Sequence, residues 1–231
     1  MKLLATILLL CVASTVIAGF DEGATAYEAG DFAKALREWK PLAEQGDVQA
    51  QYNLGVMYLE GQGVKRSTKQ ATVWFRKAAE QNHAVAQYNL STFYATGQGV
   101  PGSAKEMMIW LRKAAEQGYA MAQFDLGAVY EDGRAVVPDK TLAAQWYRKA
   151  AEQGHGDALN NLGELYAEGA GVPRDIALAY LLCSLAAENG SEAAVENRDN
   201  YAKSITPEQV EQAKAIAAKW APGTALPVSA K

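Results

Sequence analysis

Few side chains in this chain have the chemistry that catalysis needs. Its 231 residues include two cysteines, Cys11 and Cys183, and two histidines, His83 and His155. A thiol becomes a nucleophile when a neighbouring base activates it, and no histidine is obviously placed to activate Cys183. No paired cysteines or His-Glu-x-x-His segment offers metal-ligand spacing. The sequence therefore predicts no metal and no cofactor.

Serine-based chemistry also lacks its motif. Ser67 and Ser103 are each followed by a lysine after one intervening residue, which is one residue short of the Ser-x-x-Lys spacing. The glycine pair Gly61-Gln-Gly63 does not end in Gly-Lys-Ser/Thr, as a phosphate-binding loop would. The net charge of −4 gives no basic excess for nucleic acid. The sequence thus favours a protein that is not an enzyme and that binds no nucleic acid.

The elements that must position these residues form a repeat with a 36-residue period. The segment that begins Ala50-Gln-Tyr-Asn-Leu and ends at Tyr58 returns with its starts at Ala86, Ala122 and Ala158. Between these segments the block Lys-Ala-Ala-Glu-Gln occurs three times, starting at Lys77, Lys113 and Lys149. A fixed period of this length is typical of stacked helical units, in which each unit buries its apolar face only against its neighbours.

Each period encodes two helices. Ala50, Leu54, Met57 and Tyr58 have the spacing of one apolar stripe, and Gly61 and Gly63 end that helix. Ala71, Trp74, Phe75 and Ala78 form the stripe of a second helix. The Arg-Lys-x-x-Glu pattern at Arg76, Lys77 and Glu80 is interpreted as a solvated face with opposite charges one turn apart.

The repeat also provides an internal control on chemistry. His83 and His155 share their slot with Asp47 and Tyr119, so we interpret the slot as a loop surface and not as a catalytic base. Cys183 shares its slot with Phe75, Leu111 and Tyr147, which predicts a buried core position.

The ends of the chain depart from the repeat. Residues 1–18 have the pattern of a cleavable signal peptide, with one basic residue, an apolar run and the small Ala18 before the expected cleavage site. Residues 19–46 form a shorter helix pair and residues 191–220 form C-terminal capping helices, with Thr206-Pro207-Glu208 as a helix start. Residues 221–231 are expected to be a flexible tail.

The repeated segments resemble the Sel1-like repeat, a relative of the tetratricopeptide repeat. The resemblance covers four copies within residues 47–190, and residues 19–46 resemble a tetratricopeptide capping pair. It implies an all-α fold, a right-handed α-solenoid of antiparallel helix pairs, with the first helix of each pair on the concave side. It also implies an exported adaptor that binds a protein or peptide. Some relatives described as β-lactamase-like carry a cysteine pair in each repeat, which this chain lacks.

Helical angles select the residues on the first helices that point away from the core stripe. An aromatic row and an asparagine ladder run along this face and could anchor a ligand by ring contacts and amide hydrogen bonds. Two alternatives stay open, because the rings could pack between neighbouring repeats and the amides could bond to the preceding loops. The candidate binding residues are Gln49, Tyr52, Asn53, Val56, Tyr88, Asn89, Thr92, Phe124, Asp125, Asn160, Asn161 and Glu164.

The sequence therefore predicts a periplasmic or secreted scaffold that binds a protein partner, with no membrane insertion after signal cleavage. One alternative is a structural component of an envelope complex for secretion, motility or signalling. A β-lactamase-like or other hydrolase comes third.

Overall fold

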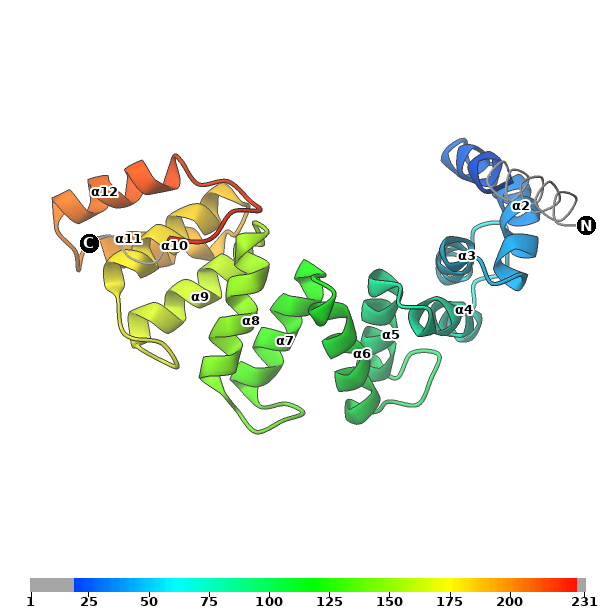
Figure 1. The fold of residues 1–231 in the computed structure, drawn as a ribbon, viewed down its shortest axis with the longest axis horizontal. Coiled ribbons are helices and arrows are strands. Elements are labelled where there is room, and N and C mark those ends of the chain that lie inside the picture. Colours follow the sequence, from blue (N-terminus) through cyan, green and yellow to red (C-terminus); the bar gives the residue numbers. More distant parts are fainter. Residues whose placement is uncertain (1–18, 228–231) are drawn as a thin grey trace, which may run out of the picture. The chain divides into compact units, whose positions relative to one another are not determined.

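The computed structural model describes residues 19–227, and these residues form helices and loops without a strand. The signal peptide predicted at residues 1–18, including Cys11, lies outside the described residues. Residues 19–28 are helical, and the helices that follow are α2 (Phe32–Glu44), α3 (Val48–Glu60), α4 (Thr68–Glu80), α5 (Ala84–Thr96), α6 (Ala104–Glu116), α7 (Ala120–Asp132), α8 (Lys140–Glu152), α9 (Gly156–Glu168), α10 (Ile176–Glu188), α11 (Ala193–Ala202) and α12 (Pro207–Ala217) (Figure 1). The all-α prediction is confirmed.

The chain divides into two compact units, one up to Trp110 and one from Leu111. In the first unit, α3 packs against α2 and α4, and α4 packs against α5. In the second unit, α7 packs on α8, α8 on α9 and α9 on α10, while α11 and α12 both pack on α10 (Figure 1). No helix within residues 19–227 has the length and the apolar character needed to cross a bilayer.

Local chemistry explains where the helices begin and end. The side chains of Asp47, Ser67 and Asp175 cap helices α3, α4 and α10 by accepting a hydrogen bond from a backbone N–H of the first turn. Four first helices of the repeat end at a glycine with positive φ, as at Gly61 with φ 76°. At Gly99 a side chain would also collide with the carbonyl of Thr68, so only glycine fits the loop there.

The core of three of the four regular helix pairs depends on one close approach, and Ser91 takes the same slot in the fourth. Gly55, Gly127 and Gly163 hold the same slot on first helices, and a Cβ atom added to them would meet Phe75, Tyr147 and Cys183 respectively. The missing side chain makes room for the large group of the second helix. Cys183 is fully buried in this slot, which confirms the core position predicted from the repeat.

Glutamines link successive repeats. Gln81 Nε2 donates to the carbonyl oxygen of Gly46 at 3.0 Å and to Gln51 Oε1 at 2.8 Å. Gln153 makes the same pair of bonds to Gly118 and Gln123 in the second unit. A recurring glutamine therefore satisfies a loop carbonyl and a buried amide at once.

Two sequence interpretations need correction. Lys77 and Glu80 are exposed, as a solvated face predicts, but the arginines of the pattern bond to a tyrosine of the next first helix, as Arg76 does to Tyr94 at 2.5 Å. The C-terminal segment was expected to be flexible, but its described residues pack against α8. The N–H of Gly223 donates to the carbonyl of Glu152 at 2.7 Å, and Leu226 is 4% exposed because it joins the apolar core of the second unit.

Candidate binding face on the first helices

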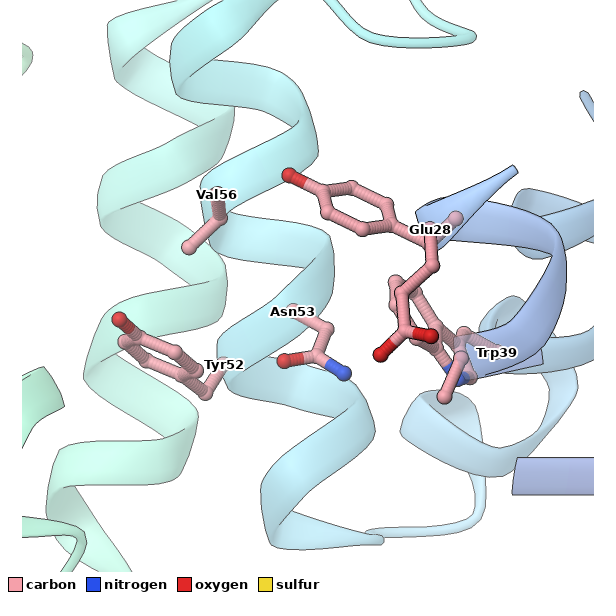
Figure 2. Close-up of a pocket in the computed structure, with 7 residues that line it drawn as sticks. Glu28, Trp39, Tyr52, Asn53 and Val56 are labelled. Atoms are coloured by element: carbon pink, nitrogen blue, oxygen red, sulfur yellow. The ribbon is translucent and has the colours of Figure 1, made fainter. Parts of the chain in front are cut away.

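Three predicted binding residues meet at one hollow in the first unit. All three residues belong to α3 and line the hollow, and Figure 2 shows the Asn53 side chain extending toward Glu28 and Trp39 of the N-terminal helix pair. The hollow has a volume of about 280 Å³ and is also lined by Ala24, Tyr27, Glu28 and Trp39. Small-molecule sites usually have volumes of about 300–1,000 Å³, so this hollow lies near the lower end of that range.

The far wall of the hollow is fixed by hydrogen bonds and a close helix approach. Trp39 of α2 is 3% exposed, and its indole N–H donates to the carbonyl of Phe20 at 3.1 Å. Gly23 lies directly against this indole, where a Cβ atom would collide with the ring nitrogen. Tyr27 donates its hydroxyl to Gln62 Oε1 at 2.6 Å and packs its ring 5.4 Å from that of Trp39. The aromatic wall is therefore preorganised.

Tyr27, Glu28 and Trp39 also line the hollow, although they are not among the binding residues predicted from the sequence. They belong to the atypical N-terminal pair, which lies outside the four regular copies. The sequence does contain a signal that residues 19–28 correspond to a first helix. Gly23 and Glu28 are five residues apart, as are Gly55 and Glu60 in the first regular copy. This spacing marks residues 19–28 as a first helix.

The aromatic row also serves inter-repeat packing, which is the alternative left open by the sequence. The ring of Tyr52 stacks on His83 with centroids 4.7 Å apart and lies 5.7 Å from Phe75. Phe124 makes the equivalent contacts with His155, at 4.6 Å, and with Tyr147. Tyr52 is nevertheless only half-buried and still lines the hollow.

The two histidines are helix caps and not loop-surface residues. His83 Nδ1 accepts the backbone N–H of Ala86 at 3.1 Å, and His155 Nδ1 accepts that of Ala158 at 3.3 Å. Burial lowers the pKa of both imidazoles below the ordinary histidine value. An uncharged ring suits this place, because only an unprotonated Nδ1 can accept the capping bond.

The asparagine ladder begins at the hollow. Asn53 is half-buried, and its Oδ1 accepts a bond from the exposed Gln49 at 3.2 Å. Within residues 19–227 no partner is found for its Nδ2, so this N–H₂ group can donate to a ligand. Tyr88 and Asn89 occupy the next copy half-buried, and the hydroxyl of the exposed Thr92 donates to the carbonyl of Tyr88.

The candidates in the last copy do not face an open surface. Asn160 is 4% exposed, and its Nδ2 donates to Glu164 at 2.8 Å. Asn197 of α11 donates from Nδ2 to both Asn160 Oδ1, at 3.0 Å, and Glu164 Oε1, at 2.6 Å. Asn161 hydrogen-bonds to Tyr147, and Asp125 is half-buried in the copy before it. Helix α11 therefore occupies the place that the sequence assigned to a ligand beside Asn160 and Glu164.

The thiol of Cys183 is unsuited to nucleophilic chemistry. It has no exposed surface, and its Sγ lies 3.7 Å from Asn160 Oδ1. Burial raises its pKa to about 12, so the thiolate is scarcely populated at neutral pH.

Comparison with known proteins agrees with the repeat structure. The model of the family described as "Sel1 repeat" matches residues 48–83, 84–119, 120–155 and 156–191. A protective antigen of uropathogenic Escherichia coli strains, which displays an SLR fold, is 33% identical over 93% of this chain, with a TM-score of 0.78. A Sel1 repeat protein from Oxalobacter formigenes is 39% identical over 71% of the chain, with a TM-score of 0.67. The chain spans about half the length of each, 48% and 47%.

No curated protein matches the chain. The likeness to the two solved structures confirms the predicted fold class, a solenoid of antiparallel helix pairs. Proteins built from these repeats generally act as non-catalytic scaffolds for protein–protein interaction.

Proposed function

This chain belongs to the Sel1 repeat family, and we propose that it is an exported, non-enzymatic adaptor that binds a protein or peptide on its first-helix face. The observation that carries the proposal is the hollow beside α3, where Tyr52, Asn53 and Val56 meet a preorganised aromatic wall. Rigid rings and fixed amides bind a partner with little loss of conformational entropy. The exported location is supported by the signal-peptide pattern in residues 1–18.

The residues of the hollow suit a polypeptide. Val56 and Ala24 offer apolar surface, and the Asn53 amide can donate to a backbone carbonyl whatever the partner's sequence. Cys183 is buried in the core, and both histidines cap helices. Because these groups have structural roles, binding is favoured over catalysis.

The test is a crosslinking pull-down from the exported fraction of the native cell. The native protein is compared with Asn53→Ala/Val56→Asp, which alters the hollow, and with Val73→Asp, which makes the same apolar-to-acid change at a residue of α4 that is 42% exposed. Circular dichroism establishes that both variants are folded. Tyr52 is left intact because its ring also packs on His83.

We expect one stoichiometric partner to be captured by the native protein and by Val73→Asp, and to be lost by Asn53→Ala/Val56→Asp. Retention of the partner by the hollow variant would contradict the proposed site. Loss of the partner with Val73→Asp alone would move the binding surface to the second helices.

A further inference from the structure

We infer that the hollow beside α3, with Glu28 and Asn53 in its lining, receives a lysine or arginine side chain of the protein partner. This inference rests on the proposed function and specifies the chemistry of the partner. Three features of the first unit carry it: an unpaired carboxylate, an aromatic lining and a local excess of negative charge.

The carboxylate belongs to Glu28. Figure 2 shows its side chain and that of Asn53 extending into the space between the N-terminal helix and α3. Among the described residues, no lysine or arginine pairs with Glu28 and no donor bonds to it. No lysine or arginine is among the residues that line the hollow, and Lys40, next to Trp39 in the sequence, pairs with Glu44. Glu28 is thus available to a cation from outside the chain.

The aromatic lining suits the same ligand. Tyr27, Trp39 and Tyr52 all line the hollow, and the polar groups of Tyr27 and Trp39 are already bonded elsewhere. Trp39 is buried behind the lining, so the accessible ring surface comes from the half-buried Tyr27 and Tyr52. Aromatic ring faces attract ammonium and guanidinium groups. The chain shows this interaction elsewhere, because Lys77 Nζ lies 4.0 Å from the ring centroid of Trp74.

The charge of the surrounding segment supports a basic partner. Residues 19–60 contain eight acidic and three basic side chains, a net charge of −5, whereas the whole chain carries −4. The acidic excess therefore lies in the segment that builds the hollow. Such a field attracts a basic partner and accelerates its association.

Other occupants fit less well. An acidic side chain would be repelled by Glu28. A purely apolar side chain would cover the carboxylate without pairing it, and the loss of hydration would go uncompensated. A lysine or arginine can pack its aliphatic stem on Ala24 and Val56 while its charged end reaches Glu28.

The experiment titrates the purified protein with blocked peptides that contain one lysine, one arginine or one norleucine between alanines. Binding is followed by the NMR signals of the Trp39 indole N–H and the Asn53 side-chain amide. Glu28→Gln removes the charge of the hollow, and Glu22→Gln removes one charge from an exposed residue of the same helix that does not line the hollow.

We expect the lysine or arginine peptide to bind about three- to fivefold more tightly than the norleucine peptide, because Glu28 is exposed and its ion pair is formed partly in water. Glu28→Gln should weaken that binding about three- to fivefold, and Glu22→Gln should leave it nearly unchanged. Equal binding of basic and norleucine peptides, or equal effects of the two variants, would overturn the inference.

The two proposals fail separately. Asn53→Ala/Val56→Asp could lose the native partner while basic peptides bind no more tightly than the norleucine peptide. That result would support the adaptor function and contradict the cation site. The basic peptides could instead bind in a Glu28-dependent way while Asn53→Ala/Val56→Asp still captures the native partner. That result would support the cation site and contradict the proposed docking of the partner at the hollow.

Discussion

In the first unit, Tyr52 and Val56 line an open hollow, whereas in the second unit the residues in the same repeat slots, Asn160 and Glu164, lie against α11. The two places share a helix type, a glycine slot and a core leucine, Leu54 or Leu162. They differ in the element beside the outer face of the first helix, which is the N-terminal helix pair at α3 and helix α11 at α9. The comparison teaches that the repeat supplies a common core, while the neighbouring element decides whether the outer face binds a ligand or a cap.

The largest expected effect tests the shared core. Leu54→Ala and Leu162→Ala, with Leu126→Ala between them, each remove a side chain that has no exposed surface. Each should lower the free energy of unfolding by about 2–5 kcal/mol, because truncation loses apolar burial and leaves a cavity. Urea titration followed by circular dichroism measures the loss. Val137→Ala, at a residue that is 85% exposed, is the control. A negligible loss of stability with Leu54→Ala or with Leu162→Ala would show that the two positions are not equivalent core positions.

A second, smaller effect separates the open face from the closed one. Asn160→Ala removes a buried amide from the bonds with Glu164 and Asn197, and should cost about 1–3 kcal/mol of stability without affecting partner binding. Asn53→Ala removes a half-buried amide bonded to an exposed glutamine, and should change stability by less than about 0.5 kcal/mol while weakening binding. Thermal melts measure the stability of both variants, and pull-downs measure their partner binding. A loss of binding with Asn160→Ala and a loss of stability with Asn53→Ala would contradict the distinction between a closed and an open face.

The smallest effect concerns a feature that both units share. Burial lowers the pKa of His83 and His155, so the unfolded chain binds more protons than the folded one just below pH 6.5. Stability should therefore rise with pH through this window and fall as the pH drops from about 7 to 5. Protonation would also disrupt the capping bonds at Nδ1.

His83→Asp/His155→Asp provides the matched variant, because Asp47 caps α3 in the same slot by accepting from the N–H of Ala50 at 2.7 Å. The double variant should have a flatter dependence of melting temperature on pH between 5 and 7 than the native protein. An unchanged slope would show that the pH dependence arises elsewhere.

The period, the helix pairs and the core residues were determined by the sequence alone, because apolar spacing and glycine breaks are local and repeat four times. The same spacing predicts Cys183 as a core residue, because its slot holds Phe75, Leu111 and Tyr147 in the other copies. Only the tertiary structure decided which part of the first-helix face is open. That outcome depends on non-repeating elements, the N-terminal pair that brings Trp39 and Glu28 to α3 and the helix α11 that brings Asn197 to Asn160. A residue's slot in the repeat determines the direction of its side chain, but contacts from distant segments determine what it meets.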